Sequence, residues 1–174
     1  MKQEYIRKIE AVKPLLQGAD HVDVHSAQGA ASLREHLAGM LGWKPLWMRG
    51  LYALRRILAS LLGLQQTDFN TRTIVGPDDI PMKRGGKVGP FTVLEAREEE
   101  YWIASARDRH LGAYLVSARE PLANGENRIH VATIVHYRHW TGPVYFNLIR
   151  PFHHLIVWLS LRKSVRRKTD SSSK

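Results

Sequence analysis

The sequence contains no cysteine, and this absence excludes several kinds of site. A chain without cysteine has no disulfide framework, no thiolate zinc site and no cysteine nucleophile. It suits a reducing compartment, so we expect a cytoplasmic protein. The sequence also lacks a phosphate-binding loop, the G-x-S-x-G nucleophile motif and the G-x-G-x-x-G dinucleotide fingerprint. No cofactor is therefore expected, and the sequence leaves open whether the protein is an enzyme.

Long apolar runs are also scarce. The longest unbroken run is Leu155–Leu159, whereas a membrane-spanning helix needs roughly 20 apolar residues. Polar residues such as Arg150 and His154 precede this run, so no transmembrane segment is expected. Glu10 and Lys13 stand where a signal peptide would need an apolar stretch.

The composition is that of a globular protein. The 174 residues are 44% hydrophobic and 24% charged, which favours one domain, expected over residues 1–168 with a polar tail over 169–174. The net charge is +10. Much of it lies near the C-terminus, where cations suit the end of a helix and also suit an anionic surface as partner. These cations are Arg162, Lys163, Arg166, Arg167 and Lys168.

Three elements are predicted in the first third of the chain. Polar and apolar residues alternate over 19–25, which indicates a short strand. Ser32 and Glu35 form a capping-box pattern that begins a helix, and Gly42 is expected to end it in the left-handed conformation. A second helix is predicted from Pro45, because apolar residues recur at helical spacing over 47–61.

The middle of the chain predicts an antiparallel meander. Residues 65–90 are rich in turn residues and leave room for one short strand at 73–75. Four segments rich in β-branched and aromatic residues follow, at 91–95, 100–106, 111–119 and 128–139. Asn124 and Gly125 indicate a hairpin, since both residue types tolerate positive φ. On the third strand Leu115 is expected on one face, and Tyr114 and Val116 on the other.

A final helix is predicted over residues 143–168. Apolar residues nearly encircle it, and Asn147, Arg150 and His154 form one polar side. His153 falls on the apolar side, which is expected to face the sheet. Pro151 predicts a kink or a restart, because its ring nitrogen cannot donate a hydrogen bond.

Four segments of the sequence resemble successive signatures of one family. They are Gly89-Pro-Phe-x-Val93, Asp108-Arg-His-Leu111, Gly142-Pro-Val-Tyr145 and Ile149-Arg-Pro-Phe-His-x-Leu-Ile156. The chain resembles the domain-of-unknown-function family 2867 over about residues 14–167. Gly112 departs from the pattern, since members often carry an acidic residue there.

The resemblance implies a fold and a cavity. The family is similar to the START-like, or Bet v 1-like, superfamily (SRPBCC). This implies an α+β helix-grip fold, in which an antiparallel sheet wraps around a long C-terminal helix and a helix pair lies near the N-terminus. A hydrophobic cavity is expected between sheet and helix. The fold needs one or two further strands within residues 65–90.

The expected cavity selects the candidate ligand-binding residues. Asp108, Arg109 and His110 lie at a bend between strands, either as a polar cluster at the cavity mouth or as turn residues that bond locally. His153 either contacts a ligand or is a buried side chain satisfied by the protein. Arg150 is expected to bond a carboxylate or a carbonyl. Tyr145 joins the set from the third signature.

No metal site is expected from the spacing of histidines. His136 and His139 are three apart, which on a strand directs them to opposite faces. His153 and His154 are adjacent on a helix and diverge by about 100°. Neither pair forms a chelate.

Three functions are compatible with these patterns. The first is a binding module that holds a hydrophobic or amphipathic small molecule between the sheet and the C-terminal helix. The second is an enzyme that uses the same cavity, with His110 or His153 as acid–base and Arg109 as an anion anchor. The third is an adaptor whose basic C-terminus contacts a membrane or nucleic acid. Three of the five tryptophans fall at core-like positions on expected helices or strands, so packing is favoured over a stacking platform for nucleic acid.

Overall fold

The computed structural model describes residues 2–43, 76–107 and 111–165. The second helix predicted from Pro45 and the strand predicted at 73–75 lie outside these residues. The described elements are α1 Lys2–Lys8, η1 Glu10–Val12, α2 Lys13–Leu16, β1 His21–Gly29, α3 Leu33–Leu41, η2 Pro77–Asp79, β2 Lys87–Val88, β3 Phe91–Arg97, β4 Tyr101–Arg107, β5 Leu111–Pro121, β6 Asn127–Tyr137 and α5 Thr141–Val165.

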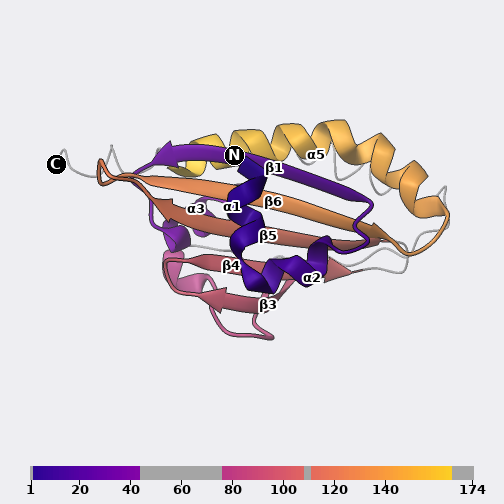
Figure 1. Cartoon of the computed structure of the whole chain (residues 1–174), viewed down its shortest axis with the longest axis horizontal. Helices are drawn as coiled ribbons and strands as arrows, with labels where there is room; N and C mark the ends of the chain where they lie inside the picture. The colour runs from indigo at the N-terminus through magenta and orange to yellow at the C-terminus, as the bar shows by residue number, and fades with distance from the viewer. Residues whose placement is uncertain (1, 44–75, 108–110, 166–174) are drawn as a thin grey trace.

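The strands form one antiparallel sheet in the order β1-β6-β5-β4-β3-β2 (Figure 1). The predicted meander is confirmed, because β3 to β6 pair in succession. The chain's first strand lies beside its last, and α5 runs along β1. The two-residue β2 supplies a strand within the segment where the resemblance required one.

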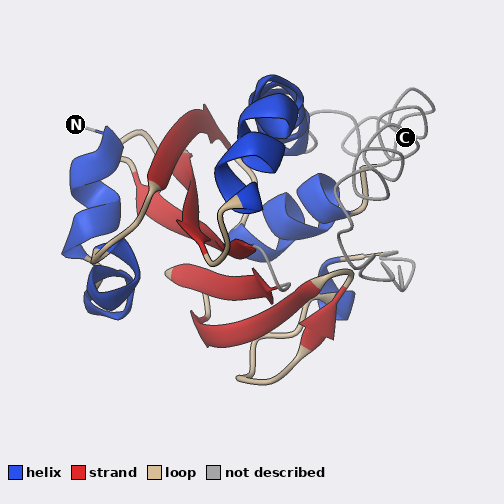
Figure 2. Ribbon diagram, turned by 90° about the vertical axis from the view of Figure 1, so that its right-hand side faces the viewer, coloured by secondary structure: helices blue, strands red, loops and turns tan. Residues whose placement is uncertain are grey.

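The sheet lies between two helical layers (Figure 2). Alternation along each strand assigns side chains to one layer or the other. Leu115 packs with α3 and α5, whereas Tyr114 and Val116 pack with the N-terminal helices, as predicted. The buried core toward α3 and α5 includes Leu33, Leu37, Trp102, Leu115, Val131, Val157, Leu161 and Val165. The buried core toward α1 and α2 includes Ile6, Val12, Ile103, Val116, Ala132 and Ile134.

These layers confirm the helix-grip α+β fold. The long helix α5 packs on the face of the sheet that α3 also covers, and it continues through Pro151 to Val165. A restart of the helix at Pro151 therefore does not occur. Pro151 removes one hydrogen-bond donor, and the turns on either side keep their own bonds.

Two glycine predictions have different outcomes. Gly42 ends α3 with φ −80, so the expected left-handed cap is wrong, and its N–H instead donates to the carbonyl of Ala38. Gly125 has φ +80, in the left-handed region as predicted. Asn124 is not in that region. Its side-chain oxygen accepts from the N–H of Glu126 at 3.1 Å, which closes the turn locally.

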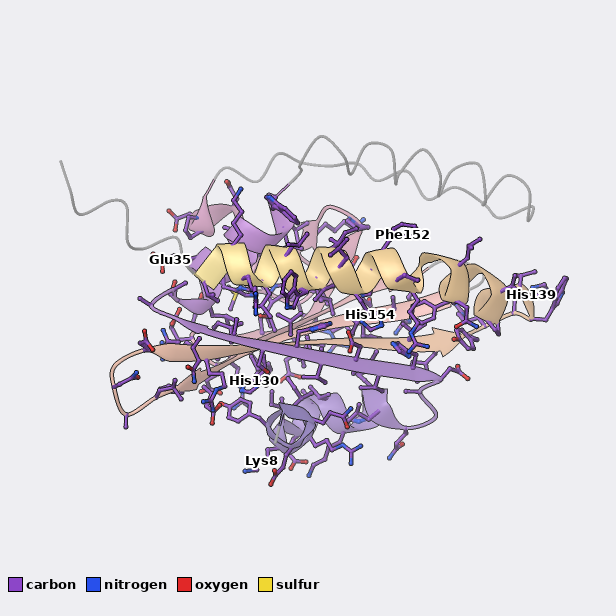
Figure 3. All side chains as sticks on the ribbon, turned by 90° about the horizontal axis from the view of Figure 1, so that it is seen from above. Lys8, Glu35, His130, His139, Phe152 and His154 are labelled. Carbon is purple, nitrogen blue, oxygen red and sulfur yellow. The ribbon has the colours of Figure 1, made fainter. Side chains whose placement is uncertain are left out.

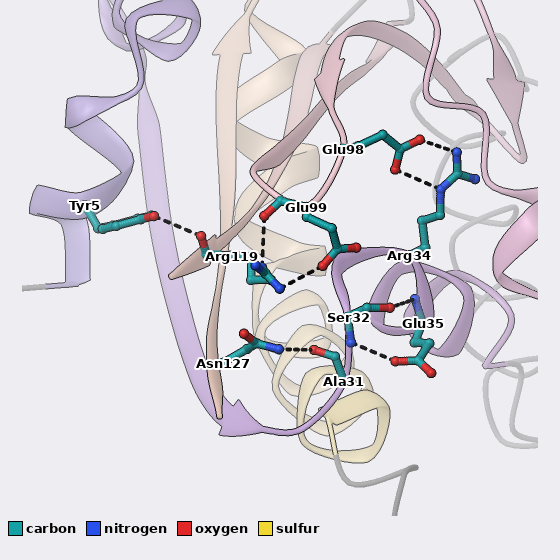
Figure 4. A network of polar contacts seen from close by, with 9 residues as sticks. All are labelled: Tyr5, Ala31, Ser32, Arg34, Glu35, Glu98, Glu99, Arg119 and Asn127. Atoms are coloured by element: carbon teal, nitrogen blue, oxygen red, sulfur yellow. Dashed lines mark hydrogen bonds and ion pairs between the residues drawn. The ribbon is translucent and has the colours of Figure 1, made fainter. Parts of the chain in front are cut away.

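Polar contacts tie α3 to the turn between β3 and β4 (Figure 4). The guanidinium of Arg34, on α3, pairs with the carboxylate of Glu98. Arg119 donates to the main-chain and side-chain oxygens of Glu99, at 2.9 and 2.8 Å. Glu99 has φ 58, a left-handed conformation that its contacts with Arg119 help to hold.

The capping box at α3 gives a stability prediction. The Ser32 hydroxyl accepts from the N–H of Glu35 at 3.2 Å, and the Glu35 carboxylate accepts from the N–H of Ser32 at 2.7 Å. Ser32→Ala is expected to lower the free energy of unfolding by about 1 kcal/mol, because one amide loses its acceptor. Urea denaturation measures this, and Ser32→Asp should retain most of the stability. Equal stability of Ser32→Ala and the wild type would contradict the prediction.

Candidate functional site

The interface between α5 and the sheet is apolar toward the C-terminal end of the helix and polar toward the other end. Toward the C-terminus, Val157, Leu161 and Val165 are buried in the core shared with α3. At this end Gly29, the last residue of β1, leaves no room for a side chain. A Cβ there would lie 2.3 Å from the carbonyl oxygen of Val165. Side chains of the described residues fill this half of the interface.

The other half of the interface is polar. The β1 sequence His21-Val-Asp-Val-His25 alternates so that Val22 and Val24 pack with the N-terminal helices. His21, Asp23 and His25 therefore share the face toward α5. Figure 3 shows His154 between α5 and β1, with Phe152 on the opposite side of the helix.

A compact group, which we call the histidine cluster, lies here. Its members are His21, Asp23, His25, Thr133, His153 and His154. One carboxylate oxygen of Asp23, Oδ2, lies 2.7 Å from Nε2 of His25 and 2.8 Å from Nδ1 of His154. Nε2 of His153 lies 3.1 Å from Oγ1 of Thr133, the cross-strand partner of Asp23. The cluster therefore joins β1 and β6 to the middle of α5.

Burial lowers the pKa of two histidines in the cluster, His21 and His153. It lowers the pKa of His153 to about 4, and the neighbouring His154 acts in the same direction. Burial also lowers the pKa of His21, with the nearby Arg150 as the next cause. Both rings are therefore neutral near pH 7.

Three buried polar atoms of the cluster have no hydrogen-bond partner in the described parts of the chain. They are Nε2 of His21, Oδ2 of Asp23 and Nε2 of His25. The last two are close together, but their contact lacks the alignment of a hydrogen bond. A buried polar atom without a hydrogen-bond partner costs about 1–3 kcal/mol, so a water, an ion or a polar group at these atoms would be stabilising.

The candidate residues of the sequence analysis are only partly described. His153 faces the sheet, as expected from periodicity. Arg150 is exposed and donates from Nε to Nε2 of His154 at 3.3 Å, rather than to a carboxylate or a carbonyl. Tyr145 lies on α5, and its side chain is outside the described part of the structure. Asp108, Arg109 and His110 also lie outside it, so their role stays a prediction.

The residues that sequence reasoning missed are His21, Asp23, His25 and His154. The spacing of histidines within one element could not reveal this set, because it combines residues of a strand with a residue of a helix. The alternation of His21, Asp23 and His25 was the available signal, because period two places all three on one face.

A separate pocket lies on the other face of the sheet, beside α1. Its volume is about 590 Å³, and its lining residues are Glu4, Tyr5, Lys8, Ser26, Ala27, Gln28, Glu120, Arg128 and His130. His130 lies 2.8 Å from the Ser26 hydroxyl and 2.9 Å from the Glu120 carboxylate, and the Tyr5 ring stacks on it. The polar groups of this pocket thus largely satisfy one another.

The outer side of α5 exposes large apolar side chains. They are Val144, Leu148, Phe152, Leu155 and Trp158, and Trp140 is exposed just before the helix begins. Trp102 is fully buried, as expected for a packing residue, whereas Trp158 on α5 is 40% exposed and Trp140 is 75% exposed. The guanidinium of Arg162 lies over the Trp158 ring, 4.2 Å from its centre. Among the described helices, none has the length and apolar character that crossing a membrane requires.

Comparisons with known proteins give one matching family and two solved structures with partial similarity. A family profile described as "Protein of unknown function (DUF2867)" matches residues 15–160. A truncated norcoclaurine synthase from Thalictrum flavum is 14% identical, with a TM-score of 0.41 over 83% of this chain and 90% of that one. A point mutant of the same enzyme with a transition-state analogue is also 14% identical, with a TM-score of 0.37 over 82% of this chain and 94% of that one. No curated protein matches the chain.

Proposed function

The chain belongs to the DUF2867 family of proteins of unknown function, and we propose that it binds a small amphipathic molecule between its sheet and α5. The observation that supports this proposal is the histidine cluster, where three buried polar atoms have no hydrogen-bond partner among the described residues. A ligand with an acceptor or donor group at one end supplies those partners. The polar end of the molecule therefore lies against the cluster.

Apolar side chains beside the cluster suit the remainder of such a molecule. Val131 and Val135 are fully buried on the same face of β6 as Thr133. Phe146, at the start of α5, contacts the ring of His21 with the ring centres 4.9 Å apart. Ligand sites commonly combine an apolar lining with a few placed polar groups, which is the composition found here.

The pocket beside α1 is the weaker candidate for this function. Its histidine, His130, already has Ser26 and Glu120 as partners. A ligand there would have to break these contacts before it made its own. The histidine cluster offers atoms that no described group hydrogen-bonds, so a ligand there would break fewer existing hydrogen bonds.

Binding is tested with the chelator-treated protein and a panel of fatty acids, aromatic carboxylates and neutral lipids. Native mass spectrometry should detect a one-to-one complex with at least one amphipathic member, and this member should raise the melting temperature. The double variant His21→Leu, His25→Leu should bind it at least about tenfold more weakly, since two of the three unsatisfied atoms are removed. The control Ser26→Ala, on the other face of the sheet, should bind like the wild type.

Two results would contradict the proposal. One is the absence of any complex across the panel. The other is unchanged affinity in the double variant, which would place the ligand elsewhere.

The two other functions stay predictions. An enzyme that uses this site would employ His153 as a base rather than an acid, because its lowered pKa keeps the ring neutral. An adaptor would use the outer side of α5, where Arg162 lies beside exposed Trp158.

A further inference from the structure

The arrangement of Asp23, His25 and His154 is that of a chelate. Their ligand atoms, one carboxylate oxygen and two imidazole nitrogens, all lie within 4.8 Å of one another. Two of the residues come from one face of β1, and the third comes from α5. Two elements of the fold thus bring together three side chains that commonly bind metals.

The contacts within this group are close without forming hydrogen bonds. Oδ2 of Asp23 lies within 3 Å of a nitrogen on each of the two rings, at 2.7 and 2.8 Å. Nevertheless, Oδ2 of Asp23 and Nε2 of His25 are buried without a hydrogen-bond partner among the described residues. One carboxylate oxygen and two ring nitrogens that converge in this way can bind a cation once the nitrogens carry no proton.

We propose that Asp23, His25 and His154 bind a divalent transition-metal ion, with Zn²⁺ as the reference ion. Two imidazoles and one carboxylate suit zinc and its neighbours in the first transition row. Mg²⁺ and Ca²⁺ prefer oxygen ligands and suit this set poorly. The site shares the histidine cluster with the proposed function, but it does not depend on the binding of an organic molecule.

Zinc binding requires the three ligand atoms to shift, because Oδ2 of Asp23 is close to both nitrogens and the three atoms lie within 4.8 Å of one another. In a tetrahedral zinc site with ligands at about 2.0–2.1 Å, neighbouring ligand atoms are about 3.3 Å apart. The present separations of 2.7 and 2.8 Å are shorter, so a bound ion would move the side chains apart by about half an ångström.

His21 is placed to support the site. Its Nε2 is buried without a hydrogen-bond partner among the described residues, and its ring centre lies 5.9 Å from that of His154. Nε2 of His21 therefore suits a hydrogen bond to a water that the ion binds.

Arg150 opposes metal binding. It donates from Nε to Nε2 of His154, which requires that nitrogen to carry no proton. Coordination through Nδ1 of His154 places the remaining proton on Nε2, so Arg150 must move away. Its side chain is exposed and can do so. Removal of the guanidinium also removes a positive charge beside the ion.

The test uses the full chain, treated with a chelator and then titrated with Co²⁺, followed by competition with Zn²⁺. The wild type should bind one ion per chain and develop the visible absorption of Co²⁺ bound by nitrogen and oxygen. Asp23→Asn and His25→Gln should each weaken binding at least about tenfold. Arg150→Met should tighten it. The matched control His139→Gln, an exposed histidine outside the cluster, should leave the affinity unchanged.

Circular dichroism at each step checks that the variants are folded. Wild-type affinity in Asp23→Asn and His25→Gln would overturn the inference, as would a wild type that binds no ion. Weaker binding in Arg150→Met would count against it too. Ion binding without any small-molecule complex would remove the proposed function alone. A small-molecule complex in a chain that takes up no ion would remove the metal site alone.

Discussion

Replacement of Trp102 with alanine is expected to lower the free energy of unfolding by about 3–5 kcal/mol. Trp102 is fully buried in the core between the sheet, α3 and α5. Its indole N–H donates to the carbonyl of Pro81 at 3.0 Å, and the ring meets Phe91 edge-on. The alanine variant would leave a cavity and a carbonyl without its donor.

Chemical denaturation followed by circular dichroism measures the effect of Trp102→Ala. The control is Trp140→Ala, the same substitution at a side chain that is 75% exposed. This control should change the free energy of unfolding by about 0.5 kcal/mol or less. The loss in free energy of unfolding for Trp102→Phe should lie between those of the two alanine variants. Phenylalanine keeps most of the apolar volume but not the hydrogen-bond donor. Similar losses at Trp102 and Trp140 would contradict the described core.

Stability is expected to fall by about 2 kcal/mol between pH 7 and pH 5 through His36 alone. His36 is fully buried on α3, and burial lowers its pKa from 6.5 to about 3. In the unfolded chain the ring takes up a proton as the pH falls below 6.5, whereas in the folded protein it stays neutral until about 3. The contribution is therefore complete above pH 6.5 and is lost as the pH falls toward 3.

The hydrogen bonds of His36 explain why protonation is so unfavourable. The Ser164 hydroxyl donates to the carbonyl of Leu161 at 2.8 Å, so it accepts from Nδ1 of His36 at 2.7 Å. Nε2 then carries no proton, and it is buried without a partner among the described residues. A second proton would place a charge at that buried nitrogen.

The pH effect is isolated by comparing wild type and His36→Leu in urea at pH 7 and pH 5. The variant should lose about 2 kcal/mol less than the wild type over this range. The other histidines contribute equally to both proteins, so the difference reports His36. Equal losses in the free energy of unfolding of the two proteins between pH 7 and pH 5 would contradict a neutral buried imidazole at His36.

The sheet could be predicted from the sequence to a large extent. The alternation on the third strand of the predicted meander assigns Leu115 and Val116 to opposite faces, and both lie as predicted. The capping box at Ser32 is a local pattern that needs no tertiary information. β2 has only two residues, which is too short to show any periodicity.

The site was harder to predict because its parts come from different elements. Nothing in the spacing of His25 and His154 indicates that they approach each other. Their contact depends on the pairing of β1 with β6 and on the packing of α5 along β1. His153 was predictable from helical periodicity alone, whereas its neighbour His154 was assigned to the polar side and yet reaches Asp23.

The contact between Gly29 and Val165 has a consequence for access to the interior. It fixes one end of the long helix against the tip of the first strand, since any side chain at Gly29 would displace the helix backbone. Movement of the helix is therefore expected to be greatest near Thr141, at the end opposite to Val165. A ligand that binds at Asp23 would enter from that side, past Phe146, and leave by the same route.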